Sequence, residues 1–150
     1  MTQAQMTSSA ATGIPELDSA PGESGGWIED LVNRLGWHDQ HKAYLALIAT
    51  LHALRDNLPS DEAAYLGEQL PTLLRGFYFE GWHLREKPLE LSDRETFFSR
   101  IHEVLHHDVA IDPEQVVRSV FRLLSKRLSP AELEDVVAAS PEPLHGLWPL

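Results

Sequence analysis

The chain contains no cysteine, which excludes disulfide bonds and thiolate chemistry. Any metal site would have to use histidine and carboxylate ligands. Long hydrophobic runs are absent too, because no stretch approaches the roughly 20 apolar residues that a membrane helix needs. The N-terminus also lacks the basic start and apolar stretch of a secretory signal. We therefore expect a cytoplasmic protein that does not enter a membrane.

Several catalytic motifs are missing as well. The sequence has no G-x-x-x-x-G-K-[ST] loop, no G-x-G-x-x-G segment after a strand and no G-x-S-x-G elbow. Most carboxylates fall at expected helix starts and on exposed faces, where compensation of the helix dipole explains them without catalysis. We therefore predict a protein that is not an enzyme and that holds no cofactor.

Basic residues are scarce. Twelve Lys and Arg against 23 Asp and Glu give a formal charge of −11. An acidic protein repels polyanions, and this repulsion counts against broad binding to nucleic acid or to an anionic membrane.

What the chain does contain is a weak internal repeat, at an offset of 70 positions that places Trp27 on Phe97. When 27–80 is aligned with 97–150 without a gap, the identities fall on core-type leucines and on the proline and glycine that end helices. The sequence thus predicts an all-α fold of about eight helices in two tandem four-helix repeats. The seven identical pairs are Leu35/Leu105, Leu54/Leu124, Leu58/Leu128, Glu62/Glu132, Pro71/Pro141, Leu74/Leu144 and Gly76/Gly146.

Capping residues place the starts of the predicted helices. Asp39 precedes a long helix, and Asp112 followed by proline precedes its counterpart in the second repeat. Ser60 is expected to cap the third helix. Two capping boxes are predicted in the second repeat, at Ser92-Asp93-Arg94-Glu95 and at Ser129-Pro130-Ala131-Glu132.

The segment 1–26 is predicted to be a disordered acidic tail. It is rich in Ser, Thr, Ala, Gly and Pro and carries Glu16, Asp18 and Glu23 without a basic residue. The rest, 27–150, is expected to form a single helical domain. Its parts are repeat one at 27–80, a connector at 81–96 and repeat two at 97–150.

Two sets of segments resemble a known family. They are Leu58-Pro59-Ser60-Asp61-Glu62-Ala63-Ala64, Gln69-Leu70-Pro71-Thr72-Leu73-Leu74-Arg75-Gly76 and Gly81-Trp82 in the first half, and 121–132 with 141–148 in the second. Together they resemble the two halves of the bacterial domain of unknown function 2267 family. The resemblance covers about residues 27–150. It implies a small all-helical protein with an internal duplication, and it implies no catalytic residues.

His102-Glu103-Val104-Leu105-His106 matches H-E-x-x-H, the zinc-protease motif. On a helix, the two histidines would lie one turn apart with Glu103 beside a metal-bound water. No third ligand follows at a familiar spacing, and the trio lies off the apolar face, so we interpret the match as coincidental. The weaker alternative is a metal-binding surface cluster of His102, His106 and His107, helped by His38 and His41.

The second candidate site is an aromatic run of Phe77, Tyr78, Phe79 and Trp82, bracketed by Gly76 and Gly81. Four aromatic residues in six positions cannot all face inward from one short helix. We predict that at least two of the rings pack in the seam against the second repeat, with the glycines acting as a hinge. Any exposed ring would then be a protein-binding surface, because aromatic residues concentrate at interfaces.

The third candidate is a basic stripe of Arg118, Arg122 and Lys126 at four-residue steps, with Arg127 beside it. Such a stripe is typical of the solvated face of an amphipathic helix. It could also receive an acidic partner or a phosphate.

These observations predict a small acidic helical protein that acts through protein contacts as an interaction or regulatory module, with a partner that the sequence does not identify. A homodimer is one possible form. The alternative function is that of a metal-binding or metal-responsive protein that uses the surface histidines.

Overall fold

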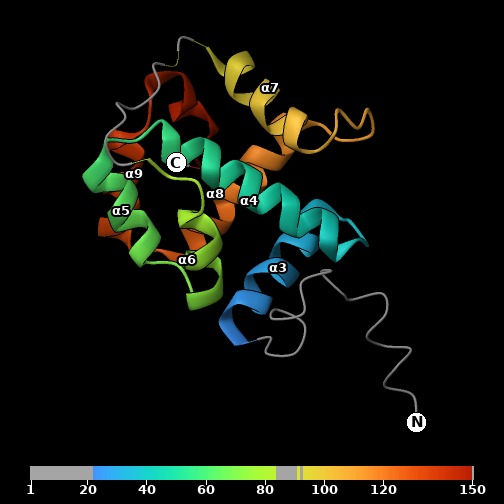
Figure 1. Cartoon of the computed structure of the whole chain (residues 1–150), viewed down its shortest axis with the longest axis horizontal. Helices are drawn as coiled ribbons and strands as arrows, with labels where there is room; N and C mark the ends of the chain where they lie inside the picture. The colour runs from blue at the N-terminus through green and yellow to red at the C-terminus, as the bar shows by residue number, and fades with distance from the viewer. Residues whose placement is uncertain (1–21, 84–90, 92, 150) are drawn as a thin grey trace.

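The structure, a computed structural model, describes residues 22–83, 91 and 93–149. Within these ranges the chain forms eight helices and no strand (Figure 1), as predicted. They are α3 (Gly22–Leu35), α4 (Gln40–Asp56), α5 (Ser60–Glu68), α6 (Thr72–Phe79), α7 (Arg94–Val104), α8 (Pro113–Arg127), α9 (Pro130–Ala139) and the 3₁₀ helix η1 (Glu142–Leu147).

Three of the predicted helix caps are confirmed. The Asp39 side chain accepts a hydrogen bond from the Lys42 amide at 3.0 Å, and Asp112 accepts one from the Glu114 amide at 3.0 Å. Ser129 and Glu132 form a reciprocal capping box at the start of α9. Each cap satisfies amide groups that the first turn of a helix leaves without a partner.

Two other predicted caps are wrong. The N-cap of α5 is Pro59, with no side-chain hydrogen bond, and Ser60 is already the first helical residue. The N-cap of α7 is Asp93, whose carboxylate accepts from the Thr96 amide at 2.9 Å. Ser92, the predicted cap, lies outside the described residues. Aspartate caps as well as serine does, so the one-residue shift costs the helix nothing.

The predicted tail boundary at 26 is also wrong, because α3 begins at Gly22. Three glycines lower the helix propensity of this first stretch. Tertiary burial offsets that cost: Ser24 is 5 % exposed and Trp27 is 3 % exposed. Of the predicted tail, 1–21 lies outside the described residues. The predicted connector, 81–96, also ends too late, because α7 already begins at Arg94.

One hydrophobic core runs through the whole helical body. The leucines predicted to be buried in both repeats are all buried. Helix α4 runs across the middle of the molecule and packs on α3, α7 and α8, while α5 packs on α9 (Figure 1). α3 also packs on α8, so helices from the two halves of the sequence interlock. Of the helices that the structure describes, none combines the length and apolar character required to cross a bilayer.

Candidate functional site

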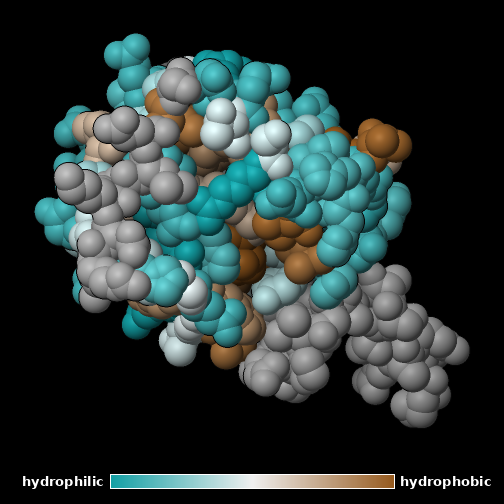
Figure 2. All heavy atoms as spheres, turned by 45° about the horizontal axis from the view of Figure 1, so that its top comes forward, coloured by the Kyte–Doolittle hydropathy of each residue, from teal (hydrophilic) through white to brown (hydrophobic). Residues whose placement is uncertain are grey.

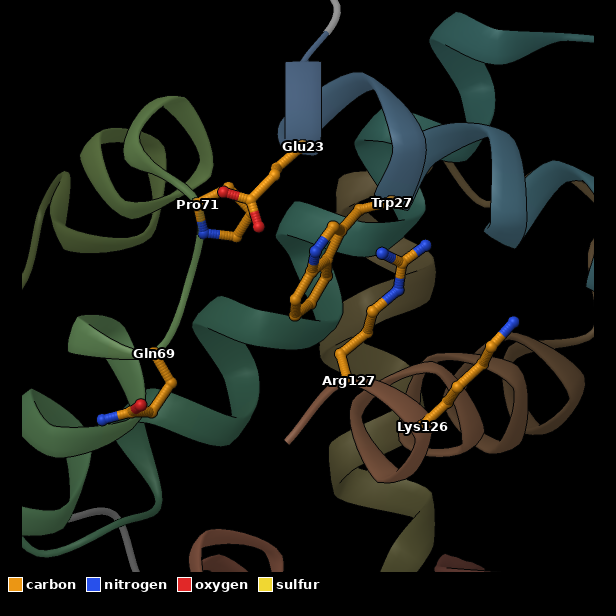
Figure 3. A pocket seen from close by; sticks show the side chains of 6 residues that line it. All are labelled: Glu23, Trp27, Gln69, Pro71, Lys126 and Arg127. Atoms are coloured by element: carbon orange, nitrogen blue, oxygen red, sulfur yellow. The ribbon is translucent and has the colours of Figure 1, made fainter. Parts of the chain in front are cut away.

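A pocket of about 460 Å³ opens where three segments meet. The beginning of α3 supplies Glu23 and Trp27, and the turn between α5 and α6 supplies Gln69 and Pro71. The C-terminal end of α8 completes the wall with two cationic side chains, Lys126 and Arg127 (Figure 3). The pocket therefore depends on both halves of the chain.

Arg127 lies over the Trp27 indole in the middle of the pocket (Figure 3). Its guanidinium carbon is 5.6 Å from the ring centroid, within range of a cation–π interaction. The same guanidinium donates to the Gly26 carbonyl and to Asp30 Oδ2, each at 3.3 Å. These contacts fix the Arg127 side chain over the indole, which is itself only 3 % exposed, so Arg127 and the buried ring together form one wall of the pocket.

Asp30 lies behind this wall and gathers three cations. Arg34 Nε donates to Asp30 Oδ1 at 2.9 Å, and Lys126 Nζ lies 3.6 Å from Asp30 Oδ2. Burial alone would raise the pKa of Asp30, but Arg34, Lys126 and Arg127 together hold it below its ordinary value. The carboxylate therefore stays ionised and anchors the two cations at the pocket.

Lys126 is the more exposed of the two cations at the pocket. It keeps 61 % of its side chain exposed, against 31 % for Arg127, and extends away from the indole (Figure 3). Its ammonium group can receive a carboxylate of a ligand.

The predicted basic stripe of Arg118, Arg122 and Lys126 lies on α8 as expected, and we call it the cationic row. Arg118 is held by Glu114, with its Nε at 2.9 Å from the carboxylate, and it donates to the Gly146 carbonyl at 3.3 Å. Arg122 is exposed and forms no ion pair within the described part of the chain. Lys126 connects the row to the pocket.

The aromatic run lies within the first half of the chain instead of in a seam against the second. Tyr78 is fully buried, and its hydroxyl donates to the Ala63 carbonyl at 2.7 Å. Burial raises the pKa of Tyr78. Phe79 packs on Tyr78 and on Trp82 at centroid distances of 5.0 and 5.5 Å, and Phe77 packs on a tyrosine of α4. Tyr78 is buried, and the other three aromatic residues are half-buried.

The ring contacts that the structure describes lie within the first half, where α6 packs on α3, α4 and α5, and none of them supports the predicted packing against the second repeat. The predicted hinge at Gly76 is wrong, because Gly76 lies inside α6. Gly81 does adopt a left-handed backbone, with φ of +74°, and turns the chain after the helix. Gly67 permits the close packing: a Cβ there would meet the rings of Tyr78 and Phe79.

Two side chains of α4 hold the carbonyls at the end of α6. His52 Nε2 lies 2.8 Å from the Phe77 carbonyl, and Arg55 Nη1 donates to the carbonyls of Tyr78 at 2.6 Å and Glu80 at 2.8 Å. Arg55 is only 3 % exposed. A buried guanidinium with these partners satisfies carbonyl groups at the end of α6 that the helix itself leaves without a donor.

The H-E-x-x-H segment does not lie on one continuous helix. α7 ends at Val104, so His102 is helical, whereas His106 and His107 have positive φ values of 60° and 54°. His102 Nε2 contacts the carbonyl of Asp108 at 3.0 Å. Among the residues that the structure describes, no group of three or more histidine and carboxylate side chains is arranged to hold a metal ion.

The sequence analysis missed the pocket. It singled out Lys126 and Arg127 as part of a stripe, but Trp27 was read as a core residue and Glu23 as part of the tail. No periodicity connects these residues, because they lie about 100 positions apart, as in the contact between Gly26 and Arg127. The pairing of α3 with α8 brings them together.

The comparisons with known proteins show the family of the chain and assign it no chemistry. No curated protein matches the chain. The model of one family, described as "Uncharacterized conserved protein (DUF2267)", matches residues 25–147. This match covers nearly all of the described helices, as the resemblance of the two sets of sequence segments led us to expect, and the chain therefore belongs to the domain of unknown function 2267 family.

Proposed function

We propose that the protein is a non-catalytic interaction module whose cationic row on α8 receives an acidic segment of a partner protein. The observation that carries the proposal is the state of Arg122: it is exposed and unpaired among the described residues of a chain with a net charge of −11. Most other arginines of known position are bound to carboxylates or carbonyls. An unpaired arginine in acidic surroundings is available for a partner's carboxylate.

Charge complementarity explains why the partner would be acidic and would bind at this face. The acidic surface elsewhere repels an acidic segment, while the cationic row attracts it, so the encounter is directed to α8. The visible face in Figure 2 is largely hydrophilic, with apolar atoms confined to small areas. A polar recognition surface fits this distribution better than a large apolar one.

The pocket beside Lys126 would give such a partner a specific anchor. Its volume of about 460 Å³ accommodates one side chain. A partner residue with an acidic end could fill the pocket while its neighbours follow the cationic row. The metal-responsive alternative has weaker support, because His106 lies beyond the end of α7. We place this activity in the cytoplasm.

Fluorescence anisotropy with a labelled peptide of ten glutamates tests the proposal. We expect the wild-type chain to bind it and Arg122→Glu and Lys126→Glu each to weaken binding by about threefold or more. Lys42→Glu makes the same charge change on α4 and should have less effect. Equal weakening by Lys42→Glu, or no binding by the wild type, would contradict the proposal. Proteins captured from lysate by wild type and lost with Arg122→Glu, at an unchanged melting temperature, would identify the partner.

We also propose that the fold consists of two tandem four-helix repeats, related by the offset that places Trp27 on Phe97. The helix boundaries support this, because α5 begins at Ser60 and α9 begins at the corresponding position, Pro130. The chain also leaves the first helix of each half by the same wide turn. The Trp37 amide donates to the Val32 carbonyl at 3.1 Å, and at the corresponding positions the His107 amide donates to the His102 carbonyl at 2.8 Å.

Side-chain contacts support the duplication in the same way. Arg75 Nη2 donates to the Leu70 carbonyl at 3.2 Å, and His145 Nε2 lies 2.7 Å from the Ser140 carbonyl. The two contacts again occupy corresponding positions, although the residue types differ. An experimentally determined structure in which the backbone of α3–α6 fails to superpose on α7–η1 would contradict the duplication.

A further inference from the structure

Two ion pairs connect the halves of the chain at corresponding places. Asp30 on α3 lies 3.6 Å from Lys126 on α8. Asp56 on α4 forms an ion pair with Arg100 on α7. The helix pairs involved, α3 with α8 and α4 with α7, are two of those through which the two halves interlock.

When the two repeats are aligned, the positions of one ion pair correspond to the positions of the other, with acid and base interchanged. Asp30 corresponds to Arg100, and Asp56 corresponds to Lys126. One position on the first helix of each half thus meets one position on the second helix of the other half, and this contact occurs twice. In both contacts the first half supplies the carboxylate and the second half supplies the cation.

The carboxylates are held in the interface more firmly than surface charges. The side chains of Asp30 and Asp56 are 14 % and 22 % exposed. Arg127 adds a second cation to Asp30 at 3.3 Å. Each carboxylate also has an arginine from its own half, Arg34 at 2.9 Å from Asp30 and Arg55 at 2.8 Å from Asp56.

We propose that these exchanged charges make the inner surface of each half specific for the unlike half. The inference rests on the proposed duplication and does not depend on the proposed function. A half that carries acids at both positions fits a half that carries bases at both positions. The partner selected by this surface is therefore the other half of the chain, and a second copy of the same half is rejected.

Pairing of like halves would bring equal charges together at both contacts. Two second halves would place Arg100 against Lys126 and Arg127, with no carboxylate in reach from Asp30 or Asp56. Two first halves would place Asp30 against Asp56, each with its own-half arginine but without the cation across the interface. Like charges at such distances are unfavourable, most of all where solvent is partly excluded.

Full-length variants can imitate the pairing of like halves. Arg100→Asp/Lys126→Asp gives the second half the charges of the first, so that both contacts become acid against acid. We expect its melting temperature to fall by about 4–8 °C relative to wild type. Arg122→Asp makes the same kind of change at an exposed, unpaired position of α8, and its melting temperature should stay close to that of wild type.

Neutralising the facing carboxylates gives the decisive comparison. In the wild-type background, Asp30→Asn/Asp56→Asn removes two attractions and should lower the melting temperature by about 2–6 °C. In the Arg100→Asp/Lys126→Asp background, the same two changes remove two repulsions together with the remaining attractions to Arg34, Arg55 and Arg127. They should therefore lower the melting temperature by at least about 2 °C less than in wild type, or raise it. A structural role without charge recognition would make Asp30→Asn/Asp56→Asn lower the melting temperature equally in both backgrounds, and this result would overturn the proposal.

Two further measurements keep the test decisive. If Arg100→Asp/Lys126→Asp fails to fold, Lys126→Asp replaces it, since that side chain is 61 % exposed. Asp30→Asn must then lower the melting temperature less in the Lys126→Asp background than in wild type. In 1 M salt the destabilisation should shrink, because charges are then screened within about 3 Å. A destabilisation that is independent of salt would also count against the proposal. Melting temperatures do not involve a binding partner, so this outcome is separate from that of the peptide experiment.

Discussion

The chain turns after α3 and after α7 with the same backbone hydrogen bond, but with different residues at the turn. Gly36 has a φ of +70°, and the corresponding His106 has a φ of +60°, followed by His107 at +54°. Glycine adopts this region without cost, whereas a residue with a Cβ loses about 1–2 kcal/mol there. The comparison teaches that the two turns share a hydrogen bond and a left-handed residue, while the cost of that conformation differs.

The strained turn is held by contacts that the first half lacks. Asp108 accepts a hydrogen bond from the Ala110 amide at 2.9 Å and lies 3.5 Å from Lys42. The His102 ring packs edge-on against His107 and contacts the carbonyl of Asp108. These contacts offset the strain, since a non-glycine residue stays in the left-handed region only where its surroundings hold it there.

We expect the largest loss of stability from substitutions in the buried core, where the two halves have the same residue at corresponding positions. Leu54 and Leu124 occupy corresponding positions and are both fully buried. Leu54→Ala and Leu124→Ala should each lower the free energy of unfolding by about 2–5 kcal/mol, because each leaves a cavity in the shared core. Urea denaturation measures both. If one leucine cost less than about 1 kcal/mol while the other cost several, the two positions would not be structurally equivalent.

We expect a somewhat smaller loss of stability at a position where the two halves carry different residues. Arg55 holds the carbonyls of Tyr78 and Glu80, while the corresponding Ser125 bonds to the Phe121 carbonyl of its own helix at 2.8 Å. Arg55→Ser copies the second half and leaves buried carbonyls unsatisfied, so we expect a loss of about 2–3 kcal/mol. Ser125→Ala should cost about 1 kcal/mol or less. Equal losses in urea denaturation would show that Arg55 acts through packing rather than through its hydrogen bonds.

Substitutions at the two turns should have opposite signs. His106→Gly removes the strain of the left-handed conformation and should stabilise the protein by about 0.5–1 kcal/mol. Gly36→Ala should destabilise it by about 1–2 kcal/mol. An added Cβ at Gly36 has no neighbour within 4 Å, so this loss would come from the backbone and not from a clash. Thermal unfolding of the pair, with His107→Gly as a third member, checks the signs. A destabilising His106→Gly would mean that the histidine side chain contributes more than the strain costs.

The smallest effect is a dependence on acid pH. Burial alone would raise the pKa of Asp30 and of Asp56, but neighbouring cations hold both below their ordinary value. The contribution of each pair to stability is therefore complete above about pH 4, the pKa in the unfolded chain, and is lost as the pH falls through the lower folded pKa. Asp30→Asn/Asp56→Asn should flatten the fall in melting temperature below about pH 4. An equally steep fall in the variant would assign the acid sensitivity to other carboxyls.

The sequence was sufficient for features that depend on neighbours in the chain. Asp39, Asp112 and Ser129 were recognised as caps because an N-cap acts on amides two or three positions later. The buried leucines followed from the helical spacing and the internal repeat. These inferences require no knowledge of which helices meet.

Features that depend on distant segments were missed. The start of α3 at Gly22 reads as a flexible tail, and burial of Ser24 and Trp27 against other helices makes it helical. The aromatic run was assigned to the seam between repeats because nothing in the sequence indicates that Arg55 and His52 tie the end of α6 to α4. The pocket was missed for the same reason, since the contact of α3 with α8 creates it.

The pairing of α3 with α8 has a consequence for the order in which the protein folds during synthesis. Arg127 contacts Asp30 across 97 positions of sequence, so Trp27 cannot reach its buried position until the end of α8 has left the ribosome. At about 5–20 residues per second, the nascent chain therefore exposes the part of α3 that packs on α8 for about 5–20 s while the intervening residues are made. The docking of α3 is thus complete only after α8 has been synthesised.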